Sequence, residues 1–141
     1  MYVETYTFTH RISTAGNGDI IDLTNYCQQA LGDSGVREGV LICFVSHSTC
    51  AITAMELEPG AVADLTAWLD AAIPADAKYQ HNILNHDTNA HAHLRSAILG
   101  PSIAVPIANS VLLFGTWQTP VLVDSDDRPR TRDVTFQVIG T

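Results

Sequence analysis

Positive charge, paired cysteines and long apolar runs are scarce in this sequence, and each shortage excludes a class of protein. Seven Lys and Arg stand against 15 Asp and Glu, which gives a net charge of -8. Such a chain repels a phosphate backbone, so nucleic acid is not an expected partner. No apolar run approaches the ~18 residues of a membrane span, and the first residues lack the basic and apolar regions of a secretion signal. We therefore expect a cytoplasmic protein with no membrane partner.

Several motifs that define nucleotide-binding and covalent enzymes are missing as well. The sequence holds no GxxxxGK[ST] or GxGxxG phosphate-binding loop and no GxSxG nucleophile elbow. Its three cysteines, Cys27, Cys43 and Cys50, form an odd set without CxxC spacing. We expect them to be reduced and buried, as free cysteines usually are. Covalent catalysis is therefore not favoured.

The length and composition of the sequence are those of one globular domain. Its 141 residues are 46% hydrophobic and 16% charged, which predicts a single domain over 1–141. Alternating or β-branched apolar residues predict strands, and apolar residues at helical spacing predict helices. The expected strands cover 2–9, 40–45, 51–55, 103–107, 111–114, 119–123 and 131–139, and the expected helices run from Asp22 to Gly32, from Pro59 to Pro74 and from Asn89 to Gly100.

The order and pattern of these segments predict the fold class. The continuous apolar run 40–45 predicts a strand buried on both faces, whereas Val134, Phe136 and Val138 alternate and share one face. Strands flank helices without a regular alternation of the two. We therefore expect an α+β fold, with a mixed or largely antiparallel sheet or sandwich and flanking helices.

Histidine is the residue type that carries most of the chemistry. Four of the six histidines lie within one stretch of thirteen residues, namely His81, His86, His91 and His93. This density indicates a metal or catalytic site, with a solvated polar loop as the alternative. On a regular helix His91 and His93 flank the apolar stripe on opposite sides, so both cannot bind one ion. His47 follows an apolar strand, where it lines a cleft or is a hydrogen-bonded core histidine.

The expected start of a helix at Asn89 offers a second kind of site. Backbone N–H groups in the first turn of a helix point outward and can bind phosphate or carboxylate. The alternative is that Asn89 only caps its own helix.

Six short motifs then follow one another along the chain. They are an HTT/HTS-type motif in 46–51, ExEPG in 56–60, YxH in 79–81, NAHAHL in 89–94, LGPS in 99–102 and GTWQ in 115–118. Through these motifs the chain from Gly39 onward resembles the YjbQ-like family, often labelled secondary thiamine-phosphate synthase. The resemblance implies a compact α+β fold, a homotrimer, a histidine-lined pocket for a divalent metal, and weak thiamine-phosphate synthase activity.

The resemblance also implies which histidines hold the metal. Matched position by position, the metal ligands are expected to be His47, His81 and His93, and zinc is the expected ion because imidazole-rich sites suit it. His10 and His86 are expected to be dispensable.

Further roles are expected for other residues of these motifs. Glu58 is the expected general base and His91 a second catalytic residue. The residues expected to bind substrate are Asn89, Trp117 and Gln118, although a tight turn with a packed Trp117 is an equal alternative for the GTWQ motif.

The sequence departs from the usual family pattern at two places. Met55 and Leu57 occupy positions of the acidic turn that more often hold Asn, which weakens the turn as a polar ligand site. Asn82 stands where relatives often place Asp, and this exchange removes a carboxylate partner for His81.

The function expected from these residues is that of a small metal-dependent enzyme acting on a phosphorylated substrate. Its reaction would join a hydroxymethylpyrimidine pyrophosphate to a thiazole phosphate and release pyrophosphate, for which a metal and helix N–H groups are suitable. One alternative is a noncatalytic trimer that binds a metal or a small anion. A further alternative is a metal-assisted phosphohydrolase that uses water as the nucleophile.

Overall fold

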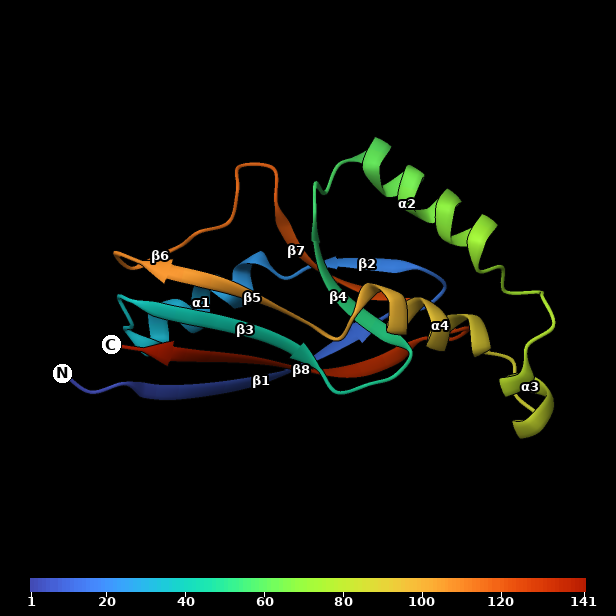
Figure 1. Ribbon diagram of the computed structural model, residues 1–141, viewed down its shortest axis with the longest axis horizontal. Helices are drawn as coiled ribbons and strands as arrows, with labels where there is room; N and C mark the ends of the chain where they lie inside the picture. Colours follow the sequence, from blue (N-terminus) through green and yellow to red (C-terminus); the bar gives the residue numbers. More distant parts are fainter.

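Two antiparallel sheets form the body of the protein, as shown by the computed structural model, which describes residues 1–141 (Figure 1). The strands are β1 (Glu4–Thr14), β2 (Asp19–Asp22), β3 (Gly39–Val45), β4 (Cys50–Met55), β5 (Ser102–Ala108), β6 (Val111–Leu112), β7 (Thr119–Asp124) and β8 (Arg130–Gly140). The helices are α1 (Thr24–Ser34), α2 (Pro59–Ala72), α3 (Gln80–Asn85) and α4 (Ala90–Leu99). The predicted α+β class with largely antiparallel strands is confirmed.

The larger sheet has five strands in the order β1-β8-β3-β5-β6, and the smaller sheet has three in the order β2-β7-β4. The long strands β1 and β8 pair along their whole length, from Glu4 opposite Gly140 to Thr14 opposite Arg130. Side chains alternate between the two faces of a strand. The predicted inward face of β8 is confirmed, because Val134, Phe136 and Val138 are all fully buried.

The main core lies between the large sheet and a second layer made of α1 and the small sheet. It contains Leu41 and Cys43 of β3, Ile52 of β4 and Leu122 of β7, together with Cys27 of α1. Helix α4 packs against β4 on the other side of the small sheet. The small sheet is therefore a middle layer, and this is why its strands are buried on both faces along β7, where Val121, Leu122 and Val123 are all buried, and in the first half of β4.

The prediction that residues 40–45 form a strand buried on both faces is wrong. In β3 only Leu41, Cys43 and Val45 are buried, whereas Val40 and Ile42 on the outer face are half-buried. Phe44 has 43% of its surface exposed. The reason is that no helix of the chain covers the outer face of the large sheet, and a continuous apolar run cannot reveal this.

The boundaries of the first helix differ from their prediction. α1 ends at Ser34 and not at Gly32, because Gly35 adopts a left-handed conformation with φ of 68° and its N–H bonds to the Leu31 carbonyl. The helix was expected to begin at Asp22, but its first residue is Thr24. Asp22 accepts a hydrogen bond from the Thr24 N–H at 2.8 Å.

Two short elements were absent from the sequence prediction. β2 has four residues, and α3 occupies the histidine-rich segment that was expected to be a loop. Both are too short for hydrophobic periodicity to identify. α3 carries His81 and places its ring beside that of His93 on α4.

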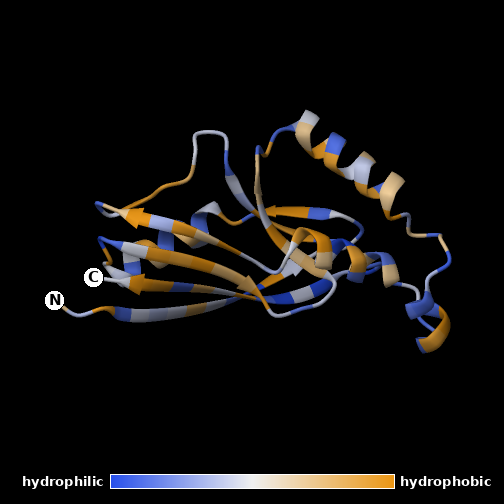
Figure 2. Ribbon diagram, viewed as in Figure 1, coloured by the Kyte–Doolittle hydropathy of each residue, from blue (hydrophilic) through white to orange (hydrophobic).

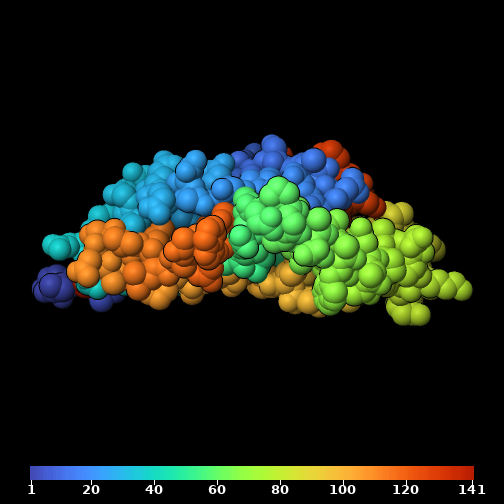
Figure 3. Space-filling model, turned by 90° about the horizontal axis from the view of Figure 1, so that it is seen from above, coloured from blue at the N-terminus to red at the C-terminus, as the bar shows by residue number.

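Helix α2 extends along the outer surface of the molecule (Figure 3), and Leu69 is its only buried residue. Arg95 of α4 anchors its C-terminal end. The buried Arg95 guanidinium donates to the Ile73 carbonyl at 2.7 Å and the Leu69 carbonyl at 3.3 Å, and it contacts Asp70 at 3.2 Å. Hydrophobic and hydrophilic residues follow one another along α2 (Figure 2). Val62 and Leu65 are half-buried, whereas Trp68 has 54% of its surface accessible. None of the helices combines the length and the apolar character that crossing a membrane requires.

Candidate functional site

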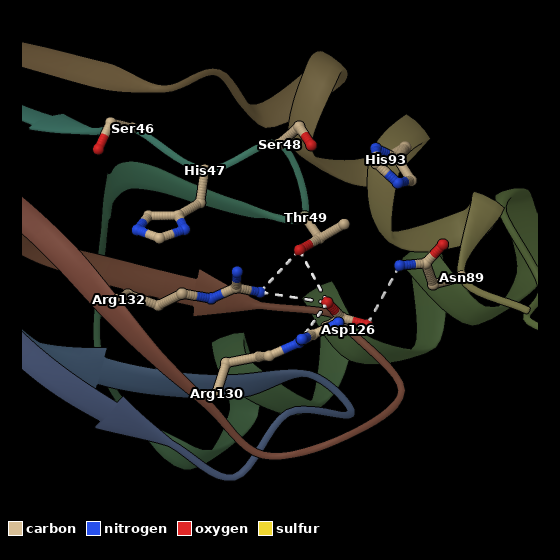
Figure 4. Close-up of a pocket in the computed structure, with 9 residues that line it drawn as sticks. All are labelled: Ser46, His47, Ser48, Thr49, Asn89, His93, Asp126, Arg130 and Arg132. Atoms are coloured by element: carbon tan, nitrogen blue, oxygen red, sulfur yellow. Dashed lines mark hydrogen bonds and ion pairs between the residues drawn. The ribbon is translucent and has the colours of Figure 1, made fainter. Parts of the chain in front are cut away.

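A polar cavity of about 390 Å³ lies where the two sheets and α4 meet (Figure 4). None of its lining residues is hydrophobic. They are Ser46, His47, Ser48, Thr49, Asn89, His93, Asp126, Arg130 and Arg132. They come from the β3–β4 connection, the start of α4, the β7–β8 turn and the beginning of β8.

The fold brings these segments together because the chain changes sheets at one end of the molecule. The connections β1 to β2, β3 to β4 and β7 to β8 each lead from one sheet to the other. The backbones of the β1–β2 and β7–β8 connections are joined by hydrogen bonds, with the Asn17 N–H donating to the Asp126 carbonyl at 2.7 Å. Gly16 permits this approach through its φ of 71°, and a Cβ at this position would lie only 2.4 Å from the Arg128 carbonyl oxygen.

Arg132 forms a buried ion pair at the base of the cavity. Its Nε and Nη2 atoms contact the two Asp124 carboxylate oxygens at 2.7 and 3.0 Å, in a two-pronged arrangement. Nη2 also donates to the Thr49 hydroxyl at 2.7 Å. Asp124 accepts a further hydrogen bond from Thr14 at 2.6 Å, so both charges are compensated although neither side chain is exposed.

Asp126 is the second buried carboxylate. It accepts hydrogen bonds from the Thr49 hydroxyl at 2.9 Å, from Arg130 Nε at 3.0 Å and from the Asp127 N–H at 2.8 Å. Burial acts to raise the pKa of Asp126, but these hydrogen bonds, a contact with Asn89 and the charge of Arg130 hold it well below its ordinary value. Asp126 is therefore ionised at neutral pH and is fully engaged with its neighbours.

Several guanidinium N–H groups remain available beside these ion pairs. Arg130 uses only Nε on Asp126, and Arg132 uses Nε and Nη2, so Arg130 Nη1 and Nη2 and Arg132 Nη1 make no hydrogen bond within the chain. Arg130 is about one-third exposed, at 36%. The cavity thus combines saturated carboxylates with unsaturated cationic donors.

His47 has a defined orientation in the cavity. Its Nε2 atom accepts the backbone N–H of Asp133 in β8 at 2.9 Å. In the neutral ring the proton must therefore be on Nδ1, which makes Nδ1 a hydrogen-bond donor. His47 lines the cavity as predicted, and its hydrogen bond joins the β3–β4 connection to β8.

His81 and His93 are brought together by the packing of α3 on α4. Their ring centroids are 4.4 Å apart. Burial, and then the neighbouring His81, lower the pKa of His93, so this ring is neutral at pH 7 and keeps a lone pair. The two rings form a pair at the edge of the cavity. Of the two, only His93 lines the cavity itself.

Asn82 has two contacts that the sequence did not reveal. Its Oδ1 lies 3.2 Å from His81 Nδ1 and accepts the Ala90 N–H at 3.0 Å. The amide oxygen thus supplies the partner for His81 that the exchange of Asp for Asn was expected to remove. It also caps α4, a role that Asn89 does not have, because Asn89 makes no capping hydrogen bond and directs its amide to Asp126 at 3.4 Å.

The predicted zinc set is only partly assembled. No group of three or more His, Cys, Asp or Glu side chains has the arrangement of a metal site. His81 and His93 fit as two ligands, since Asn82 binds His81 Nδ1 and leaves Nε2 with a lone pair. His47 does not fit in its present orientation, because one ring nitrogen accepts a backbone N–H and the other carries the proton. A three-histidine site stays a prediction.

The structure places other predicted residues outside the cavity. Glu58 caps α2, accepting the N–H groups of Gly60 and Ala61, so its carboxylate is engaged away from the histidines. Trp117 is 73% exposed in the β6–β7 segment, and Gln118 accepts the Gly115 N–H at 2.9 Å in the same turn. Their predicted roles as general base and substrate ligands are not supported by proximity to the cavity in a single chain.

The remaining three histidines lie outside the cavity. His91 is buried on α4, does not line the cavity, and has Nδ1 without a hydrogen-bond partner. Burial, and then the charge of Arg95, lower its pKa. His10 packs against aromatic rings, and His86 ends α3 in a left-handed conformation. The catalytic role of His91 stays a prediction.

Sequence reasoning missed the four charged residues of the site. None of Asp124, Asp126, Arg130 and Arg132 was among the predicted site residues. A signal was present: alternation along β8 puts both arginines on the face of Val134, which is the inward face. Charged residues at inward positions of a strand indicate a buried ionic network.

Comparison with known proteins gives consistent matches over nearly the whole chain. The family model described as "UPF0047 protein YjbQ-like" matches residues 8–141. A UPF0047 protein of Methanothermobacter thermautotrophicus is 36% identical over 140 residues, which cover 99% of this chain and 96% of that protein. The UPF0047 protein YugU of Bacillus subtilis is 29% identical over 134 residues, covering 94% of this chain and 98% of that protein.

Solved structures agree with these matches. A YbjQ-like protein of Sulfolobus solfataricus superimposes with a TM-score of 0.94 at 32% identity, covering 99% of this chain and all of that chain. A protein of the same family from Clostridium acetobutylicum gives a TM-score of 0.84 at 30% identity, covering 93% of this chain and 98% of that chain.

The buried carboxylate Asp126 yields a test of the site's architecture. Asp126→Asn replaces the buried carboxylate that accepts from Arg130 Nε and Arg132 Nη2 by an amide, so that Arg130 loses its anionic partner while Arg132 keeps Asp124. The free energy of unfolding at pH 7 should fall by about 3 to 5 kcal/mol, as measured by chemical denaturation. Asp127→Asn, next in the chain and partly exposed, should cost less than about 1 kcal/mol.

The pH dependence of the same variant checks the cause. Because the folded-state pKa of Asp126 is depressed, its contribution is present above the ordinary aspartate pKa near 4 and is lost as the pH falls below it. The wild-type protein should lose stability more steeply than Asp126→Asn in that acid range. Parallel pH profiles for the two proteins would contradict this assignment.

Proposed function

The chain belongs to the UPF0047 YjbQ-like family, and on this premise we propose that its polar cavity binds the phosphoryl group of a small phosphorylated substrate. The observation that carries the proposal is the set of unsatisfied donors in a cavity without hydrophobic residues: Arg130 Nη1 and Nη2, Arg132 Nη1 and His47 Nδ1. Guanidinium groups bind phosphate through paired N–H donors. Because the chain as a whole carries a net charge of -8, this cluster of cationic donors is a local exception to its negative charge.

The buried carboxylates do not oppose anion binding. Asp124 and Asp126 are each compensated by guanidinium and hydroxyl donors, so their charges are already balanced. They fix Arg130 and Arg132 in place before the substrate arrives. A preorganised donor costs little reorganisation on binding, which favours both affinity and stabilisation of a developing anion.

The reaction we propose is of the thiamine-phosphate synthase type. A thiazole nitrogen forms a bond to the methylene carbon of a hydroxymethylpyrimidine pyrophosphate, and the bond from that carbon to the pyrophosphate oxygen breaks. The developing negative charge is on pyrophosphate, and Arg130, Arg132 and His47 would stabilise it. Ser46 and Ser48 supply further hydroxyl groups around the same anion.

The family resemblance adds a divalent metal to this proposal. His81 and His93 would hold it beside the cavity, and zinc bound there would act as a Lewis acid toward a phosphoryl oxygen. Asn82 would orient His81 for this role through its contact with Nδ1.

The resemblance also includes a homotrimer. Two uncovered apolar regions support it, namely the outer face of β3 with Phe44 and the length of α2 with Trp68. Exposed apolar patches of this kind are typical of subunit interfaces.

A noncatalytic anion-binding protein is the second candidate function. One observation favours it: Asp124 and Asp126 are saturated by hydrogen bonds and Glu58 is a helix cap, so none of these three carboxylates is free to act as a general base. A phosphohydrolase needs such a base to activate water, so the same observation disfavours that alternative. Product formation separates the enzyme from the binding protein.

Anion binding can be tested with inorganic phosphate and pyrophosphate by calorimetry. Arg130→Gln removes the free guanidinium donors and should weaken binding by about tenfold or more, the value of a charged hydrogen bond. Arg128→Gln is the matched control, because Arg128 lies in the same turn, is more exposed and does not line the cavity. Equal affinities of the two variants would contradict the proposal.

Metal binding is tested by zinc titration of purified protein. Because His81 and His93 form the pair with available lone pairs, His81→Ala and His93→Ala should each reduce the zinc affinity by at least about tenfold. His86→Ala should leave it unchanged. If His86→Ala has the larger effect, the assignment of the ligands is wrong.

The oligomeric state is tested by light scattering at micromolar concentration. The expected mass is three times that of the 15.2 kDa chain. Phe44→Asp introduces a charge on the outer face of β3 and should shift the mass toward the monomer. A monomeric wild-type protein would contradict the proposed trimer.

A further inference from the structure

A second cavity adjoins the polar one and differs from it in chemistry. Its volume is about 250 Å³. His47, Ser48 and His93 line both cavities, so the two cavities adjoin at these three residues. The arginines and Asp126 do not line the second cavity. Its other residues include Cys50, Ala97 and Pro101.

The lining of the second cavity contains no carboxylate and no guanidinium. Burial raises the pKa of Cys50 to about 12, so its thiol is protonated at neutral pH. Cys50 has only 1% of its surface exposed. Ala97 and Pro101 contribute methyl and ring carbons only. A charged group would lose hydration here without gaining a partner, and this makes its binding unfavourable. An uncharged group does not have this cost.

The Ser96 side chain gives a second, independent observation. Ser96 lines the same cavity and is 92% buried, and its Oγ has no hydrogen-bond partner in the chain. Buried hydroxyl groups in proteins are normally hydrogen-bonded. An uncharged group that carries one hydrogen-bonding atom would satisfy this hydroxyl.

We propose that the second cavity binds the organic part of the substrate, and that this part is a single uncharged ring attached to a phosphate ester. The inference rests on the proposed phosphate site, because the polar cavity holds the phosphoryl group and His93 lies at the junction. A cavity of about 150 Å³ accommodates benzene, so the observed volume suffices for one ring with a small substituent. The substrate class is therefore a compact aryl or heteroaryl phosphate ester.

A third cavity, on the other side of His93, is the competing location. It is lined by Tyr79, Ala90 and Leu94, among others. It shares only His93 with the polar cavity, whereas the second cavity shares three residues. This larger shared wall favours the second cavity as the ring site.

The experiment compares inorganic phosphate, phenyl phosphate and glycerol phosphate as probes in calorimetric titrations. Phenyl phosphate should bind about tenfold more tightly than inorganic phosphate, because the ring is removed from water. Glycerol phosphate, which is polar throughout, should show no such gain. Ala97→Leu fills the cavity from an exposed helical position and should abolish the gain, while its unchanged affinity for inorganic phosphate shows that the variant is folded.

Two matched variants complete the design. Ile98→Leu changes the next residue of α4, which is 59% exposed and lines no cavity, and should keep the full gain. Leu94→Trp fills the third cavity and should also keep it. Loss of the gain in Leu94→Trp but not in Ala97→Leu would place the ring elsewhere and overturn the inference. Equal binding of phenyl and inorganic phosphate would overturn it while leaving the phosphate site intact, and failure of all three probes would overturn both proposals.

Discussion

Two buried carboxylates paired with arginines, Asp124 with Arg132 and Asp126 with Arg130, are the interactions on which the arrangement of the site depends. They join the end of β7, the following turn and the beginning of β8, and through Thr49 they reach the β3–β4 connection. Removing one partner would leave a buried charge uncompensated, which costs several kcal/mol. The network therefore holds the β3–β4 and β7–β8 connections in one geometry, and the cavity lies beside it.

The same network determines which chemistry the cavity can support. Each carboxylate is saturated by hydroxyl, backbone and guanidinium donors, so neither is free to act as a base or to repel an anion strongly. The arginines, by contrast, have more N–H groups than the carboxylates use. The surplus of donors is what remains exposed to a ligand, and this makes an anion site compatible with a protein of high negative charge.

Hydrogen bonds to the histidines divide them into two kinds. The Asp133 N–H fixes the proton of His47 on Nδ1, which suits donation to an anion, whereas Asn82 holds His81 so that Nε2 keeps its lone pair. Such outer contacts decide whether an imidazole donates a proton or offers a lone pair. His47 and His81 thus differ in which ring nitrogen is free and in whether it donates or accepts, although their side chains are chemically identical.

The sequence by itself determined the fold class and most of the long strands and helices, and it singled out His47, His81 and His93 as candidates, because periodicity and motif order are local properties of the chain. It did not determine that Asp124, Asp126, Arg130 and Arg132 form the base of the site, since these residues become neighbours only when β7 and β8 bring their ends together. Nor did it show that one face of β3 is uncovered, because an apolar run is the same whether or not another layer packs on it. Glu58 was interpreted as a base and is a helix cap, since the position of a carboxylate relative to backbone N–H groups depends on where the helix begins. Local pattern fixes the elements; which polar groups share a buried space is decided by the packing of elements that are distant in the chain.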